Sequence, residues 1–359
     1  MCLVFLNHAS VTKAVPSLLT RMAQHPYLGF AGHGVKLFFV ISGFLITSIL
    51  LRELARSGAI DGMAFLRRRA RRILPALLCF LLVVGVLRWM GVYTFDWRHL
   101  IAALTFTGRT GSWELGHLWS LAVQEQFNLA WALVLALGGR RFASHCAVAA
   151  VILVPIARVV LVTFDPDAAS LYLTNGASID TIALGCLLAL HRERLATQRW
   201  FNAVVDSRYW IPLIYVIAAS SLFVGSRPSI LVRTPLVAVA LVLLVERCIR
   251  HPDRGWARWL TTPAVLYLGS ASYSLYLWQQ LFLKPGSPSW TNAFPVNVLA
   301  AVAVGLLSWH LIERPYATRR LGTSVALARL SAARATWLAR YRASIGSVVD
   351  RAAQPLTLT

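Results

Sequence analysis

Nine long apolar runs constrain the fold of this chain more than any other feature. They cover residues 31–51, 73–95, 117–137, 145–164, 177–191, 209–225, 231–249, 262–284 and 296–312. A helix needs about 20 apolar residues to cross the ~30 Å hydrocarbon core of a membrane. Lipid offers no hydrogen bonds to the backbone, so such runs must be helical. We therefore predict an all-α polytopic transmembrane bundle of about ten spans, in which Met1–Leu6 is the end of a first span truncated at its N-terminus.

The distribution of basic residues predicts an orientation. Segments 52–72, 138–144, 192–208, 246–261 and 313–359 hold 25 of the 35 Lys and Arg residues, whereas the opposite loops, with Lys284 at a border, hold 7. Basic loops stay in the cytoplasm. We expect a multi-pass protein of the bacterial inner (cytoplasmic) membrane, with the Arg-rich loops and the C-terminus inside. The net charge of +21 sits in short loops, so it sets topology and does not indicate nucleic acid.

The composition indicates one membrane domain and no metal site. Only 14% of residues are charged, against roughly 25% in soluble domains. We expect a transmembrane domain at 1–322 and a basic cytoplasmic tail at 323–359, which could form an amphipathic helix on the membrane surface. The five cysteines and nine histidines show no metal-ligand spacing.

His8 is the first candidate for chemistry. It lies at the predicted outer end of the truncated first span, in Leu6-Asn7-His8-Ala9. A neutral imidazole can take a proton from a hydroxyl near pH 7. A lone histidine at a span end is also commonly an interfacial or packing residue, so its position alone leaves both interpretations open.

An arginine block opens the run at 73–95. Arg68, Arg69 and Arg72 in Phe65-Leu66-Arg67-Arg68-Arg69-Ala70-Arg71-Arg72-Ile73-Leu74-Pro75 lie on adjacent positions of a helix. Guanidinium groups bind phosphate in a bidentate way. The alternative is an anchor that sets topology and meets anionic lipid head groups. The spacing alone favours the anchor.

Several polar side chains lie inside apolar runs, where they are costly and usually face a cavity or a partner. Glu125 and Asp180 are site candidates on this argument, while Glu313 is expected to form an ion pair with Arg314. The aromatic and hydroxyl residues around Tyr273 could stack on a sugar or pack helices. No partner can be named for Lys36 or Arg158.

Together these segments resemble the acyltransferase-3 family of integral membrane acyltransferases, whose familiar members O-acetylate cell-surface glycans. The match follows the order of the chain and includes Ser42-Gly43 in the apolar segment 34–47. Its other parts are His8, Phe65 to Pro75, 118–129, Asp180 with 183–189, Gly269 to Trp278, and Glu313-Arg314-Pro315. Each piece is weak, but seven in the right order make chance similarity improbable.

The resemblance implies an O-acyltransferase with an acyl-CoA donor, usually acetyl-CoA, and a hydroxyl acceptor on a glycan or glycolipid. It implies that His8 is catalytic, and it gives Glu125 a less direct claim. Arg68, Arg69 and Arg72 would hold the CoA phosphates, with Ser42 and Gly43 shaping the site. The expected substrate-binding residues are Trp119, Asp180, Tyr273 and Trp278. No permanently bound cofactor is implied.

The chain departs from the family pattern at several positions. The basic residue that the family places eleven positions before its histidine would fall before Met1, and the start codon could be misassigned. Lys36 stands where an Asp is common, and Gln124 replaces the first carboxylate of a Glu-Glu-Gln-Phe motif. Asn128 and His310 replace usual aromatics.

Two other functions compete with the enzyme. A non-enzymatic carrier or channel for a glycolipid or small anion is motivated by the in-span charges Arg158, Glu125 and Lys36. It predicts flux without acyl-CoA turnover. A scaffold for a glycan-assembly complex predicts that no titratable residue matters. The ordered motifs favour the enzyme.

Overall fold

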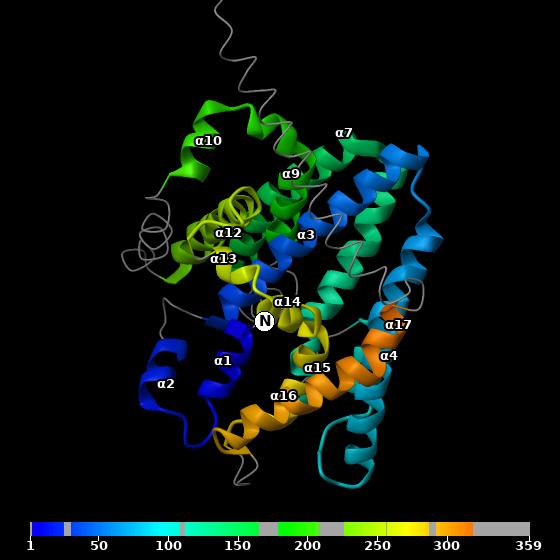
Figure 1. The fold of residues 1–359 in the computed structure, drawn as a ribbon, viewed down its shortest axis with the longest axis vertical. Helices are drawn as coiled ribbons and strands as arrows, with labels where there is room; N and C mark the ends of the chain where they lie inside the picture. Colours follow the sequence, from blue (N-terminus) through cyan, green and yellow to red (C-terminus); the bar gives the residue numbers. More distant parts are fainter. Residues whose placement is uncertain are drawn as a thin grey trace, which may run out of the picture.

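The computed structural model describes residues 2–24, 30–107, 112–164, 179–207, 226–255, 257–286 and 292–318, and this part of the chain is mostly helical and contains no strands. Lys13 and Ala293 form an isolated parallel bridge. Figure 1 shows the arrangement of the helices. Their bounds are α1 Cys2–Ser10, α2 Ser17–Gln24, α3 Phe30–Ser57, α4 Gly62–Trp89, α5 Arg98–Thr105, α6 Trp113–Gly116, α7 Leu118–Phe164, α9 Ile179–Ala196, α10 Arg199–Asp206, α12 Ser226–Arg250, α13 Ala257–Leu260, α14 Pro263–Ser270, α15 Ser272–Phe282, α16 Val296–Ser308, the π-helix η3 Trp309–Glu313 and α17 Arg314–Thr318.

Four stretches among the described residues are long and apolar enough to cross a membrane. They are Gly32–Ser57, Gly62–Trp89, Trp113–Leu161 and Val296–Tyr316. The helical fold class is confirmed, while a count of about ten spans is not. The predicted span 209–225 and the predicted tail 323–359 lie outside the described residues.

The chain reverses direction inside α7, at Gly139. This residue has φ 66° and ψ −172°, which is not helical and favours glycine. Before it, Trp131 donates to Thr47 of α3 at 2.8 Å. After it, the Ser144 hydroxyl meets His191 near the end of α9 at 2.7 Å, whereas Arg158 reaches Asp180 at the start of α9. The two halves therefore correspond to the separate apolar runs at 117–137 and 145–164.

The helices α3 and α9 cross with their backbones in close contact. A Cβ atom on Gly43 would lie 2.1 Å from the carbonyl oxygen of Ile182, and one on Gly185 would lie 2.1 Å from that of Val40. Only glycine at both positions permits this approach. The crossing seats the core residues Phe39, Ile46 and Ile182 against the first half of α7.

Two predicted boundaries were wrong. The run at 73–95 belongs to a helix that begins at Gly62, because the Asp61 carboxylate caps it by accepting from the backbone N–H of Ala64 at 2.8 Å. The arginine block is therefore part of α4. The run at 262–284 is broken at Ala271 into α14 and α15.

Candidate active site

The side chain of His8 lies near the end of α1, beside residues of two other helices. Its ring packs edge-on against Trp113, with 5.7 Å between the ring centroids. The Gln279 amide of α15 approaches the same ring. Trp113 is held in place because its Nε1 donates to the carbonyl oxygen of Gln280 at 3.0 Å. The Nδ1 atom of His8 is buried and has no hydrogen-bond partner among the described residues.

A second histidine, His117, lies close enough to His8 for the two rings to interact electrostatically. Its Nε2 lies 3.1 Å from the carbonyl oxygen of Leu277. A carbonyl oxygen only accepts, so Nε2 carries a proton and Nδ1 of the neutral ring presents a lone pair. That Nδ1 is also buried without a hydrogen-bond partner in the described part of the chain. His117 is thus a candidate base with a set tautomer.

Contacts around His117 hold its ring in place. The ring packs edge-on against Tyr276 at 5.0 Å and Phe80 at 5.8 Å. The Tyr276 hydroxyl donates to the carbonyl oxygen of His117 at 2.6 Å and lies 2.6 Å from the Ser120 hydroxyl. We call His8, Trp113, His117 and Gln279 the histidine region.

A buried polar face continues from this region along α7. It consists of Ser120, Gln124, Glu125 and Asn128, which share one side of α7 by their spacing, and His117 directly precedes the helix on the same side. All five side chains are buried. The Gln124 amide donates to the Ser42 hydroxyl. Neither side-chain polar atom of Asn128 has a partner within the described segments. Polar side chains buried along an apolar, membrane-spanning helix usually face a cavity or a binding partner, so this face indicates a site inside the helical bundle.

The arginines of α4 meet this face at its far end. Arg69 donates to both carboxylate oxygens of Glu125 through its Nε and Nη2, and Nε lies 2.7 Å from Oε2. Arg68 binds Glu53 of α3 at 2.6 Å. Arg72 lies close enough to Tyr273 and Glu313 to interact electrostatically with both. We call Arg68, Arg69, Glu53 and Glu125 the arginine region.

The two predicted catalytic residues are not brought together. Glu125 follows His117 by eight residues, which corresponds to about 12 Å along the helix. Its carboxylate is engaged by Arg69. Two of the three arginines predicted to hold phosphate therefore have carboxylate partners within the protein. Arg69 is paired with Glu125, and Arg68 is paired with Glu53 at the protein surface. Their proposed binding role stays a prediction.

The small pair Ser42-Gly43 lies between these regions. Ser42 accepts from Gln124, while the contact of Gly43 with α9 accounts for its lack of a side chain. A role of either residue in binding the donor stays a prediction.

The predicted substrate-binding residues lie in different surroundings. Trp119 packs edge-on against Phe39, with centroids 6.2 Å apart. Tyr273 donates to the carbonyl oxygen of Ile73 at 3.0 Å. Trp278 packs on Phe80, and its Nε1 is buried with no hydrogen-bond partner in the described part. The indole N–H of Trp278 is thus a buried donor that a ligand could use.

Asp180 forms a buried ion pair with Arg158 at 3.0 Å, with 2% and 1% of the side chains exposed. Its other oxygen accepts from the backbone N–H of Thr181. The structure thereby supplies the partner that the sequence did not reveal for Arg158. The pair links the second half of α7 to α9, which accounts for both charges without a substrate.

Glu313 has a different partner from the one expected. Its carboxylate accepts from the Ser274 hydroxyl at 2.7 Å, and it lies in the π-helical turn η3. The Arg314 guanidinium lies 5.4 Å from the centre of the Trp309 ring. Adjacent residues of a helix point about 100° apart around its axis, which directs these two side chains to different neighbours.

Sequence reasoning missed His117 and Gln279. The available signal was the position of His117 at the head of a polar helical face and the pair Gln279-Gln280 within an apolar run. Both amide atoms of Gln279 are buried without hydrogen-bond partners in the described residues. Those residues include no cluster of three or more His, Cys, Asp or Glu that could hold a metal ion.

Comparison with known proteins identifies the family of this chain. A family model described as an acyltransferase domain matches residues 1–314. The chain belongs to the acyltransferase-3 family. The resemblance read from the ordered motifs is thereby confirmed.

Two curated relatives of this chain carry informative names. YrhL of Bacillus subtilis (strain 168), whose name provisionally calls it a peptidoglycan O-acetyltransferase, is 27% identical over 85% of this chain and 54% of its own length. O-acetyltransferase OatA of Staphylococcus aureus (strain NCTC 8325 / PS 47) is 26% identical over 79% of this chain and 52% of its own length. The chain spans about half the length of these relatives. No solved structure matches it significantly.

Proposed function

We propose that this acyltransferase moves an acetyl group from acetyl-CoA to a hydroxyl group of a cell-surface glycan, with His8 as the general base. The observation that carries the proposal is the histidine region. Two imidazoles lie together there, and each has a buried Nδ1 without a hydrogen-bond partner among the described residues. Burying such atoms unpaired is costly, so they are placed to meet a polar substrate group.

The reaction requires one proton acceptor near the attacking hydroxyl. His8 removes the hydroxyl proton while the oxygen attacks the thioester carbonyl carbon, and the carbon–sulfur bond breaks. The proton passes to the departing thiolate, so acetyl ester and free CoA are the products. Neutral His117, which lies next to His8, keeps the His8 ring in its orientation and shares the proton that His8 removes from the hydroxyl.

The acceptor and the orientation rest on different observations. The names of the relatives support a polysaccharide acceptor of the peptidoglycan kind. The 25-to-7 split of basic residues supports placing the arginine region on the cytoplasmic side. Cytoplasmic acyl-CoA then approaches from the arginine region, and the acceptor approaches the histidine region from the outer side of the inner membrane.

The test measures transfer of labelled acetate from acetyl-CoA to membrane glycans by the native protein and by His8→Ala. We expect the variant to lose ~10²–10⁴-fold in rate, the usual contribution of general acid–base catalysis. His145→Ala is the matched control, because His145 is exposed in α7 and away from the site. Equal rates for His8→Ala and the native protein at equal membrane levels would contradict the assignment.

The carrier alternative loses much of its motivation. Glu125 is bound by Arg69, and Arg158 is bound by Asp180. Charges that neutralise each other inside the protein are not available to line a conduit for an anion. Uptake of anion without CoA release would nevertheless support a carrier and overturn the enzyme proposal.

A further inference from the structure

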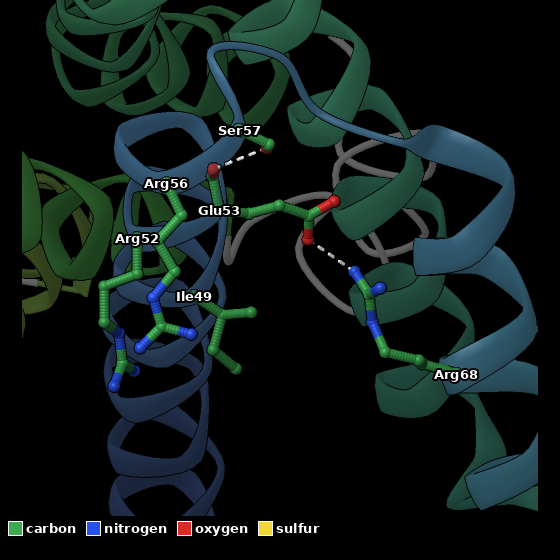
Figure 2. Close-up of a pocket in the computed structure, with 6 residues that line it drawn as sticks. All are labelled: Ile49, Arg52, Glu53, Arg56, Ser57 and Arg68. Atoms are coloured by element: carbon green, nitrogen blue, oxygen red, sulfur yellow. Dashed lines mark hydrogen bonds and ion pairs between the residues drawn. The ribbon is translucent and has the colours of Figure 1, made fainter.

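A basic pocket adjoins the arginine region and shares Glu53 and Arg68 with it, between the end of α3 and the start of α4. Its volume is about 430 Å³, within the ~300–1,000 Å³ of small-molecule sites. Figure 2 shows its lining side chains: Arg52 and Arg56 lie on α3, and Arg68 extends from α4 toward Glu53. Its lining consists of Ile49, Arg52, Glu53, Arg56, Ser57 and Arg68.

The pocket holds three guanidinium groups and a single carboxylate. Arg56 makes no hydrogen bond or ion pair within the described part of the chain, and Arg52 uses only its Nε, which donates to the Ser48 carbonyl oxygen at 2.9 Å. The terminal N–H groups of both arginines thus stay available. Arg68 is 51% exposed and binds Glu53, which is 21% exposed.

We infer that this pocket binds the phosphate groups of the acyl donor's nucleotide, with Arg52 and Arg56 as principal ligands and Arg68 completing the site. The inference rests on the proposed function, since it names the donor subsite of the same reaction. Acyl-CoA carries a phosphate monoester and a diphosphate, and planar guanidinium groups bind such oxygens in pairs. Neither arginine of α3 belongs to the motif that the family resemblance singles out.

The pocket is also placed to serve the histidine region. Arg68 precedes Phe80 on α4 by twelve residues, which is about 18 Å along the helix. Phe80 contacts the His117 ring. If the nucleotide of acyl-CoA binds in the pocket, its extended pantetheine arm must span these ~18 Å to reach the histidine region. The arm would run along the polar face of α7.

Glu53 has a defined part in this site. It occupies Arg68 and also accepts from the backbone N–H of Asp61 at 3.0 Å. An incoming phosphate must compete with this carboxylate for Arg68. Removing the charge of Glu53 therefore favours phosphate binding, whereas removing Arg52 and Arg56 disfavours it.

The experiment uses the full chain in neutral-lipid vesicles and compares two donors. Acetyl-CoA carries the nucleotide, and acetyl-pantetheine lacks it. We expect the double variant Arg52→Gln/Arg56→Gln to raise KM for acetyl-CoA roughly 10- to 30-fold and to leave KM for acetyl-pantetheine unchanged. Glu53→Gln should lower KM for acetyl-CoA about threefold. Arg67→Gln is the matched control, because Arg67 lies on α4 outside the pocket lining and should change neither constant.

Other outcomes overturn the inference. Equal effects of the double variant on both donors would mean that the arginines act on folding alone. A loss of activity that appears only when anionic lipid is present would assign them to lipid head groups. If the native protein transfers no acetyl group, the proposed function fails, and calorimetric binding of adenosine 3′,5′-bisphosphate decides the pocket separately. Equal affinity of the native chain and the double variant for that probe would then refute it.

Discussion

The histidine region and the arginine region lie at opposite ends of one polar helix face. They differ in whether their polar side chains have partners within the protein. In the arginine region, Arg69 meets Glu125 and Arg68 meets Glu53. In the histidine region, ring nitrogens of His8 and His117 are buried without hydrogen-bond partners in the described residues. A paired charge is neutralised within the protein, whereas an unpaired buried polar atom lowers stability unless a ligand meets it. The contrast supports the proposal that chemistry occurs at the histidine end and positioning at the arginine end.

The largest effect that would sharpen this contrast is expected for His117→Ala. Loss of a base beside His8 should reduce kcat by ~10²-fold or more, with KM for acetyl-CoA unchanged, because the donor's nucleotide binds elsewhere. Steady-state transfer of labelled acetate measures both constants. Unchanged kcat, at a protein level equal to that of His145→Ala, would reduce His117 to a packing residue.

A smaller effect is expected in the arginine region, and on stability. Glu125→Ala leaves the Arg69 guanidinium partly buried without its partner, which should lower the free energy of unfolding by about 2 kcal/mol. The side chains are 22% and 10% exposed, so the loss is less than for a fully buried pair. Thermal unfolding in detergent measures it.

The double variant Glu125→Ala/Arg69→Gln distinguishes a structural role of the Arg69–Glu125 ion pair from a catalytic role of Glu125. If the pair is structural, removing both charges should recover most of the stability. Acetyl transfer should recover in parallel. Recovery of stability without any recovery of kcat would show instead that Glu125 acts in catalysis, and the division between the two regions would then be wrong.

The smallest effect is expected for Gln279→Leu, which keeps the volume of the side chain. Both amide atoms are buried without partners in the described residues, so removing them should leave the melting temperature unchanged or raise it. If the amide meets substrate beside His8, kcat/KM for the acceptor should fall roughly tenfold. A drop in melting temperature with full activity would show a structural role.

Part of the site could be predicted from the sequence because it depends on local spacing. The positions of Arg68, Arg69 and Arg72 on one helix follow from their intervals, and the polar face of α7 follows in the same way. The start of α4 was misplaced because apolar length was taken as the boundary, whereas a cap at Asp61 decides it. The spacing could not predict which charged side chains form ion pairs, because the partners lie on different helices.

The sequence alone determined the helical, membrane-spanning character of this chain, its charge asymmetry and its family, since apolar length, composition and ordered motifs do not depend on how helices pack. Only the tertiary structure decided that His8 would meet Trp113 and Gln279, and that Arg69 would bind Glu125, 56 positions away. Such contacts depend on the rotation and tilt of each helix against its neighbours. The rotation and tilt are set by close approaches, such as that of Gly43 on α3 to the backbone of α9. A Cβ atom added to Gly43 would collide with that backbone.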